Sequence, residues 1–129
     1  MGHLTLKAVG PAEPATVWER YVQVDRWADW SPQIKAVHAD RRRIAPALTG
    51  SVESIAGLRI AFVIERVDDD RRSWSWRVRL GPVRLRLQHS VQAHPRGSST
   101  SLTLHGPLPV LVAYAPLAQL ALRRLVKLS

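Results

Sequence analysis

The fold is decided by Pro14-Ala15-Thr16-Val17-Trp18-Glu19-Arg20-Tyr21, followed closely by Trp27-Ala28-Asp29-Trp30-Ser31-Pro32. The first stretch predicts an amphipathic helix, because its apolar side chains recur at helical spacing and proline suits a first helical turn. The second stretch predicts a short helix that ends before Ser31-Pro32, since the residue before a proline leaves the helical region. Three of the five tryptophans therefore follow one another closely, and a folded domain has to bury them.

On the N-terminal side, Leu4, Leu6 and Ala8 alternate with other residues and predict a first strand that ends at Gly10-Pro11. The first helix is expected to stop near Val24. Asp25 then suits the N-cap of the second helix.

On the C-terminal side, turn signals recur every ten to fifteen residues and predict an antiparallel meander. Its strands are expected near residues 34–40, 50–56, 58–66, 72–80, 83–93 and 100–106. An apolar helix over about 108–127 closes the chain, with a kink expected at Pro116. The predicted apolar face of this helix contains Leu111, Tyr114, Leu117, Ala121 and Leu125.

The strand register follows from Gly81-Pro82, because a two-residue hairpin loop makes Leu80 and Val83 face each other. Counting outward from that pair separates two faces of the hairpin. The apolar face pairs Val78 with Leu85, Trp76 with Leu87 and Trp74 with His89. The opposite face pairs Arg79 with Arg84 and Arg77 with Arg86.

Two neighbouring loops extend this register. A loop from His94 to Ser99 pairs Val91 with Leu102 and His89 with Leu104, which leaves His89 pointing inward beside Trp74. A five-residue loop at 67–71 puts Ile60, Phe62 and Ile64 on the tryptophan face and turns Glu65 outward. A four-residue loop at 68–71 is rejected because it moves those apolar side chains to the arginine face.

The composition fits one domain over residues 1–129, with 46% hydrophobic residues and no cysteine. The N-terminus lacks the pattern of a secretory signal, so we expect a cytoplasmic protein. The apolar segment Leu108–Leu122 offers an alternative, because it could be a membrane anchor. It is shorter than the roughly 20 residues that a spanning helix needs, and it contains two prolines, so a buried core helix is favoured.

The net charge of +9 invites a polyanionic partner. Only three of the 19 basic residues are lysines, and GC-rich coding alone can produce such a preference for arginine. The arginines are also spread along the chain, so we do not expect nucleic acid to be the main partner. For the arginine face of the hairpin, a solvated exterior and an anion-binding patch both fit the sequence.

His89 is the best candidate for chemistry, since an inward histidine can act as an acid or base or donate a hydrogen bond to a ligand. A buried, neutral core histidine is the alternative. The tryptophans near the N-terminus likewise fit either core packing or a cavity wall. The side chains predicted to contact a ligand are Trp30, Phe62, Trp74, Trp76, Leu87, His89, Leu104 and Tyr114.

Other constellations are absent from the sequence. The five histidines have no close metal-ligand spacing, and Asp68-Asp69-Asp70 is typical of a solvated turn. No phosphate-binding loop or activated nucleophile stands out. Catalytic residues therefore stay unassigned, and we expect neither a metal nor a cofactor.

The chain resembles the START-like, or SRPBCC, superfamily and within it the polyketide cyclase/dehydrase-like branch. The resemblance is carried by Pro14 to Trp18, by Trp27 to Pro32, by Gly50, and by Phe62-Val63-Ile64-Glu65 leading through an acidic turn to Arg72-Ser73-Trp74-Ser75-Trp76. It implies an α+β helix-grip fold, in which a curved antiparallel sheet of about seven strands wraps around a long C-terminal helix, with two short helices after the first strand.

The same resemblance implies a cavity between sheet and C-terminal helix that binds a hydrophobic or amphipathic small molecule, lipid-like or polyketide-like. One alternative is a polyketide cyclase or dehydrase with His89 as acid or base. Another is a regulatory or stress-related interaction module that uses the arginine face or the last helix. The oligomeric state stays open.

Overall fold

The computed structural model describes residues 2–127 and forms an α+β architecture. The elements follow one another in the order β1 (Gly2–Gly10), α1 (Pro14–Val22), a single 3₁₀ turn η1 (Val24–Arg26), α2 (Trp27–Trp30), β2 (Ile34–Ala39), β3 (Thr49–Ser54), β4 (Arg59–Asp68), β5 (Ser73–Leu80), β6 (Val83–His94), β7 (Gly97–Gly106) and α3 (Leu108–Leu125).

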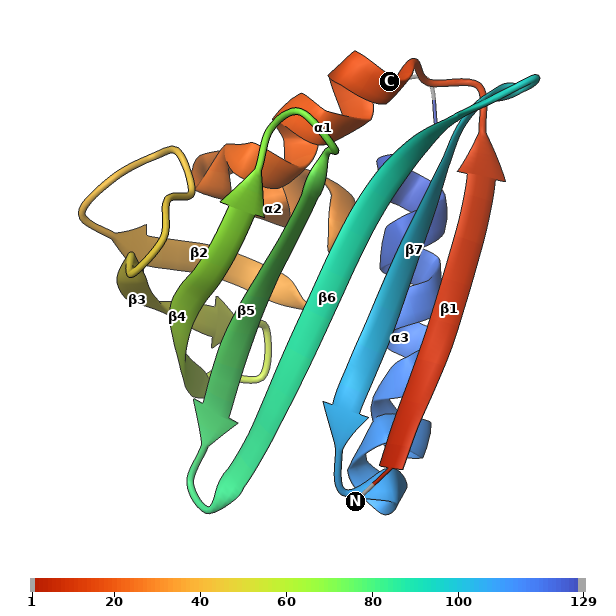
Figure 1. Ribbon diagram of the computed structural model, residues 1–129. Helices are drawn as coiled ribbons and strands as arrows, with labels where there is room; N and C mark the ends of the chain where they lie inside the picture. The colour runs from red at the N-terminus through yellow and green to blue at the C-terminus, as the bar shows by residue number, and fades with distance from the viewer. Residues whose placement is uncertain (1, 128–129) are drawn as a thin grey trace.

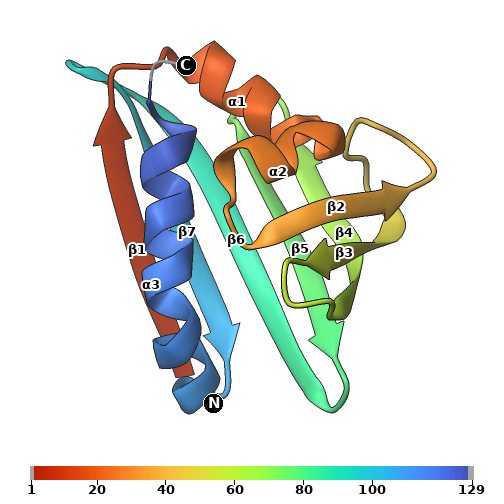
Figure 2. The same cartoon turned by 180° about the vertical axis from the view of Figure 1, so that it is seen from behind.

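The seven strands form one antiparallel sheet in the order β1-β7-β6-β5-β4-β3-β2. The sheet curves around its inner face, where α3 lies behind β1 and β7 (Figures 1 and 2). Helices α1 and α2 close one end of this arrangement, and the β5–β6 hairpin and the start of α3 lie at the other end. The expected helix-grip fold is confirmed.

The hairpin predicted from Gly81-Pro82 is confirmed at every position of the register. Leu80 pairs with Val83, Trp76 with Leu87 and Trp74 with His89, while the arginines pair with one another on the opposite face. Gly81 has a φ of 58°, a conformation that glycine adopts without a steric penalty. The turn residues therefore set which side chains of β5 and β6 face inward.

The predicted register between β6 and β7 is wrong by two residues. His89 pairs with Leu102 instead of Leu104, because the turn is the tight loop Pro95-Arg96, closed by a pair between His94 and Gly97. Gly97 adopts a φ of 140°, which side chains rarely tolerate, so a glycine is needed there. A shift of two residues conserves the face, and His89 still points inward.

The faces of β4 are also as expected, but the mechanism differs from the predicted loop. Phe62 and Ile64 are buried on the inner face, yet Asp68 pairs with Ser73 and closes a shorter loop than the five residues expected. The register shifts between Ile64 and Arg66, which makes Glu65 the extra residue of a β-bulge. This bulge restores the inward direction of the apolar side chains.

Two expectations about the helices are corrected. Asp25 lies inside the 3₁₀ turn, and Arg26 takes the N-cap position of α2 without a side-chain hydrogen bond. On α3, Leu111, Ala121 and Leu125 are buried as predicted, whereas Leu117 is 45% exposed and the buried stripe includes Ala118 and Leu122 instead. The helix continues through Pro116 from Leu108 to Leu125.

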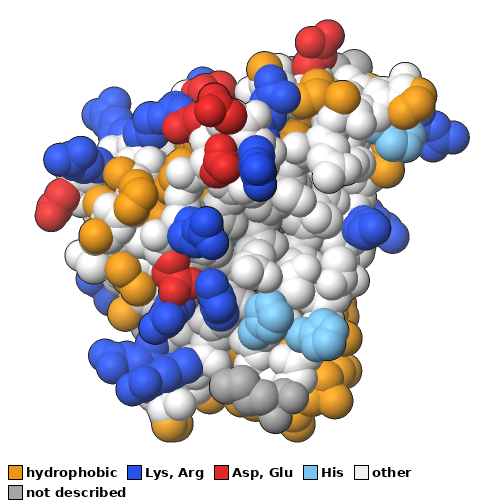
Figure 3. Space-filling view, in the orientation of Figure 1, with side chains coloured by type: hydrophobic (Ala, Val, Ile, Leu, Met, Phe, Trp, Pro, Cys, Tyr) orange, Lys and Arg blue, Asp and Glu red, His pale blue; other side chains and the backbone are white. Residues whose placement is uncertain are grey.

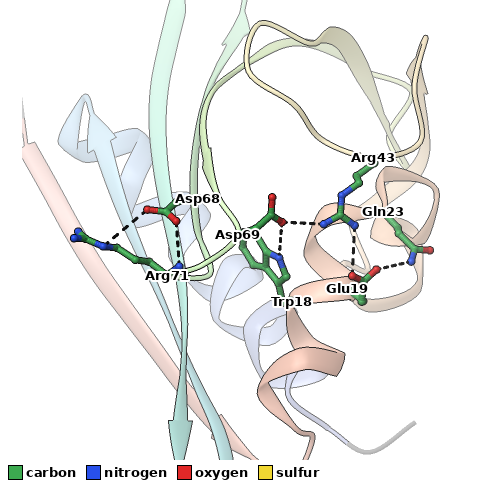
Figure 4. A network of polar contacts seen from close by, with 7 residues as sticks. All are labelled: Trp18, Glu19, Gln23, Arg43, Asp68, Asp69 and Arg71. Carbon is green, nitrogen blue, oxygen red and sulfur yellow. Dashed lines mark hydrogen bonds and ion pairs between the residues drawn. The ribbon is translucent and has the colours of Figure 1, made fainter.

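A polar network ties α1 to two loops (Figure 4). Asp69, in the β4–β5 turn, accepts hydrogen bonds from Trp18 Nε1 at 3.0 Å and from Arg43 Nη2 at 2.8 Å. Arg43 also contacts Glu19 of α1 at 3.4 Å. The acidic turn thus holds the first helix and the β2–β3 loop in place.

No helix within residues 2–127 is both long enough and apolar enough to span a membrane.

Candidate functional site: an apolar cavity beneath the sheet

A cavity of about 220 Å³ lies between the inner face of the sheet and α3. Strands β3 to β7 form one wall, and α3 together with the α2–β2 connection forms the other. The lining consists of Trp27, Trp30, Ser31, Gln33, Ile34, Val52, Ser54, Ile60, Trp74, Trp76, Val78, Leu80, Val83, Leu85, Leu87, His89, Leu102, Val110, Tyr114, Ala118, Ala121 and Leu122. This lining is apolar apart from a few neutral polar side chains.

Aromatic rings fill the end of the cavity that α1 and α2 close. Trp27, only 1% exposed, lies at the centre of this cluster, with its ring centroid 5.0 Å from that of Trp76 and 5.6 Å from that of Trp74. Tyr21 of α1 packs edge-on against Trp30 and His89. The tryptophan-rich stretch near the N-terminus therefore forms both the core at this end and part of the cavity wall.

Most of the indole groups have a hydrogen-bond partner. Trp27 Nε1 donates to the carbonyl of Tyr21 at 2.7 Å, and Trp30 Nε1 donates to the carbonyl of Arg20 at 3.1 Å. Trp76 Nε1 donates to His89 Nε2 at 3.1 Å. Trp74 Nε1 is buried without a partner within residues 2–127.

His89 lies in an environment that keeps its ring neutral. Its ring stacks on Trp74 with a centroid distance of 4.5 Å and an angle of 8°. Burial lowers the pKa of His89 from 6.5 to about 3, since desolvation disfavours the charged imidazolium. Because Nε2 accepts the hydrogen bond from Trp76, the proton resides on Nδ1, which has no partner in the described part of the chain.

A second polar group lies in the opposite wall, between the α2–β2 connection and α3. Gln33 Nε2 donates to the hydroxyl oxygen of Tyr114 at 3.1 Å. Burial raises the pKa of the Tyr114 hydroxyl, although the hydrogen bond from Gln33 acts in the other direction, so the group stays protonated. Gln33 Oε1 is buried without a hydrogen-bond partner among residues 2–127.

Six of the eight side chains predicted to contact a ligand line this cavity: Trp30, Trp74, Trp76, Leu87, His89 and Tyr114. Phe62 does not, because its ring packs behind the wall against Trp27 and Trp76 and fills the space beside Gly50. Leu104 does not either. It is fully buried on β7, the part of the sheet that α3 covers.

Several lining residues were absent from the predicted ligand contacts, and they fall into two groups. Val78 belongs to the inward face of the same hairpin, so the register around Gly81-Pro82 already contained the signal for it. Leu102 was paired with Val91 in the predicted register, whereas the observed register places it opposite His89 at the cavity. Trp27 is one of the tryptophans for which core packing and a cavity wall both fit the sequence. Gln33 had no signal, because only the packing of α2 and α3 brings it to the cavity.

The outer face of the same hairpin is charged (Figure 3). Glu65 Oε2 lies 2.7 Å from Arg77, and its Oε1 lies 3.0 Å from Arg86, so one carboxylate serves both arginines of a cross-strand pair. Arg79 and Arg84 also face each other, without an ion pair within residues 2–127. Like charges directly opposite each other destabilise a sheet, and the Glu65 carboxylate at the bulge in β4 offsets this for one of the two pairs.

Residues 2–127 contain no group of three histidine, cysteine or acidic side chains arranged to hold a metal ion. In the acidic turn, Asp68 and Asp69 form hydrogen bonds with other parts of the protein. Asp68 Oδ1 accepts a hydrogen bond from the backbone of Arg71, and Asp69 forms the network with Trp18 and Arg43.

Comparison with known proteins matches the fold to several solved structures. The chain superposes on the crystal structure of Ara h 8.0201 with a TM-score of 0.78 and 12% identity, covering 96% of this chain and 94% of that one. It superposes on XoxI from Bacillus cereus with a TM-score of 0.78 and 16% identity, covering 98% and 94%. It superposes on a hypothetical protein, jhp0584, from Helicobacter pylori with a TM-score of 0.80 and 14% identity, covering 97% of this chain and 86% of that one. At such identities the likeness shows the fold alone.

No curated protein matches the chain in sequence. A family model does match, under the description polyketide cyclase/dehydrase and lipid transport, and it spans residues 1–128. The helix-grip architecture and the solved structures agree with this match. The chain therefore belongs to the polyketide cyclase/dehydrase and lipid transport family, within the START-like, or SRPBCC, superfamily.

Proposed function

We propose that this protein binds an apolar small molecule, lipid-like or polyketide-like, in the cavity between the sheet and α3. The observation that carries the proposal is the composition of the cavity wall. Indole rings and aliphatic side chains from eight elements surround the cavity, and no charged side chain within residues 2–127 lines it. Enclosed apolar pockets with a few polar groups are the usual form of a small-molecule site.

The size of the cavity limits what it accepts. An engineered cavity of about 150 Å³ is large enough to bind benzene. The 220 Å³ observed here accommodates a compact molecule of one or two rings, whereas a long extended chain would have to reach out past Leu80, which is 39% exposed at the hairpin end. A small ligand, or the end of a longer one, fits best.

Binding is favoured over acid-base catalysis by the state of His89. With a pKa lowered to about 3 by burial, the ring holds no transferable proton at neutral pH beyond its neutral N–H, and it is a weak base. A cyclase or dehydrase that depends on this residue as acid or base is therefore not supported. The interaction-module alternative stays a prediction, because nothing in the described residues tests it.

Filling the cavity tests the proposal directly. Ala118 lines the cavity and is 2% exposed, so Ala118→Phe is expected to occupy the space with a new ring. Ala113 lies on the exposed side of the same helix, and Ala113→Phe is the matched control. Denaturing mass spectrometry then identifies small molecules that co-purify with each protein, and thermal denaturation confirms that each is folded.

We expect an apolar molecule to co-purify with the wild type and with Ala113→Phe, at a level at least tenfold above that with Ala118→Phe. Two results would contradict the proposal. One is equal retention in all three proteins, which would place the molecule elsewhere. The other is no retained molecule combined with failure of apolar probes to bind the wild type.

A further inference from the structure

The cavity wall contains one pair of polar groups whose hydrogen-bonding capacity is only half used. Gln33 Nε2 donates to the Tyr114 hydroxyl oxygen at 3.1 Å. Gln33 Oε1 remains a buried acceptor without a partner, and the Tyr114 hydroxyl hydrogen has no acceptor within residues 2–127. Both side chains line the cavity, so a free acceptor and a free donor lie next to each other, whereas the other unpartnered polar atoms of lining residues within 2–127, Trp74 Nε1 and His89 Nδ1, are both donors.

We propose that Gln33 and Tyr114 recognise a single uncharged hydroxyl on the bound molecule, so that the ligand is a compact alcohol or phenol. This inference rests on the proposed function of the cavity. A buried polar atom without a partner is costly and rare in folded proteins, and its usual partner is a water or a ligand. The pair therefore marks the place where the polar end of the ligand binds.

The donor and acceptor pattern selects the chemical group. A hydroxyl donates to Gln33 Oε1 and accepts from the Tyr114 hydroxyl, which satisfies both free positions with one ligand atom. An ether or ketone oxygen only accepts, so it would leave Gln33 Oε1 unpaired. A hydrocarbon would leave both positions unpaired.

The charge of the wall excludes an ionised group. No lysine, arginine, aspartate or glutamate within residues 2–127 lines the cavity, and His89 is neutral. A carboxylate or phosphate would lose its hydration without gaining a counter-charge, which is strongly unfavourable in an apolar site. The many arginines of this chain lie outside the cavity and do not offset that cost.

Three probes of similar shape separate these contributions: 2-naphthol, 2-methylnaphthalene and 2-naphthoate. Each carries the two fused rings that the cavity volume accommodates, with a hydroxyl, a methyl group or a carboxylate at the same position. Titration of each probe into ¹⁵N-labelled protein, followed by NMR, measures the dissociation constant. The indole signals locate the probe, because Trp27, Trp30, Trp74 and Trp76 line the cavity, whereas Trp18 does not.

Two variants remove the proposed contacts, and one serves as a control. Tyr114→Phe removes the donor and retains the ring, and Gln33→Leu removes the acceptor. Tyr21→Phe is the matched control, because it removes another buried tyrosine hydroxyl, one that is hydrogen-bonded to Thr100 and lies outside the lining. Thermal denaturation of each variant establishes that it is folded before binding is compared.

We expect Tyr114→Phe and Gln33→Leu each to weaken 2-naphthol by about tenfold, the effect of losing one buried hydrogen bond, and to change 2-methylnaphthalene by less than about twofold. Tyr21→Phe is expected to leave the affinity for both probes within about twofold, and 2-naphthoate is expected to bind at least tenfold more weakly than 2-naphthol.

Contrary results separate the two proposals. If both neutral probes bind the wild type and the variants weaken neither of them, or weaken both equally, the hydroxyl inference is overturned while binding of an apolar ligand stands. Tighter binding of 2-naphthoate than of 2-naphthol would also overturn the inference. If no probe shifts the indole signals of the lining tryptophans, the proposed function itself fails.

Discussion

The two faces of the β5–β6 hairpin differ completely although they share one backbone. The inner face pairs Trp76 with Leu87 and Trp74 with His89, whereas the outer face pairs Arg77 with Arg86 and Arg79 with Arg84. Trp74 and His89 are 3% and 6% exposed. The arginines of the outer face are exposed to solvent.

This difference separates the face that stabilises the fold from the charged exterior. Burial of aromatic rings contributes several kilocalories per mole, whereas exposed ion pairs contribute about 1 kcal/mol or less. The net charge of +9 is thus a property of the exterior, and the chemistry of the site is set by neutral side chains on the other side of the same strands. Substitutions on the two faces are expected to differ accordingly.

The largest expected effect is that of Trp74→Ala. The variant removes a ring stacked on His89 and lying next to Trp27, and the free energy of unfolding should fall by about 3–5 kcal/mol. Arg79→Ala, on the opposite face of the same strand, should change it by less than about 0.5 kcal/mol. Urea denaturation monitored by circular dichroism measures both, and similar losses would show that the two faces are not energetically distinct.

The next effect is a pH dependence that arises from the inner face alone. The unfolded His89 takes up a proton near pH 6.5 and the folded one only near pH 3, so the unfolded chain holds more protons between these values. The free energy of unfolding should therefore fall as the pH drops below about 6.5, by about 2.5 kcal/mol between pH 6 and pH 4.

His89→Gln should lack this contribution, since glutamine does not titrate and still offers Trp76 an acceptor. His3→Gln, at an exposed position of β1, is the matched control and should follow the wild type. Urea denaturation from pH 4 to pH 7 provides the comparison. An identical slope in all three proteins would mean that His89 is not buried in its neutral form.

The smallest effect concerns the carboxylate that neutralises the outer face. Glu65→Gln leaves Arg77 and Arg86 opposite each other without their shared partner and should destabilise the protein by about 1 kcal/mol at low salt. Raising the ionic strength should reduce this loss. Arg79→Gln, a site without an ion pair within residues 2–127, is the control, and a loss as large as that of Glu65→Gln would show that the carboxylate has no special role.

Sequence patterns predicted most of the inner face because one turn fixes the register of two strands. Every second residue counted from that turn then lies on the same face. Gly81-Pro82 determined the pairing of Trp74 with His89, each seven residues away from the turn. For the same reason, the errors in the neighbouring strand pairs did not change which side chains face inward. A shift by two between β6 and β7, and a bulge at Glu65 instead of a five-residue loop, both leave the inward side chains inward.

The remaining parts of the site could not be predicted in this way. Gln33 follows α2 and Tyr114 lies on α3, so they are 81 residues apart in sequence and meet only when the helix packs against the sheet. Phe62 and Leu104 do not line the cavity, for the converse reason. Both are inward by period, but the neighbours that pack over them, Trp27 and Gly50 for Phe62 and α3 for Leu104, separate them from the cavity.

Local chemistry along the chain was sufficient for the order of the elements, the turn at Gly81-Pro82 and the side of each strand that faces inward, because turn residues and side-chain period act over a few residues. The depth of burial of His89, the unused hydrogen-bonding capacity of Gln33 and Tyr114, and the existence of a cavity of about 220 Å³ depend on how α3 and α2 approach the sheet. These properties arise from packing between distant segments, and only the tertiary structure determines them.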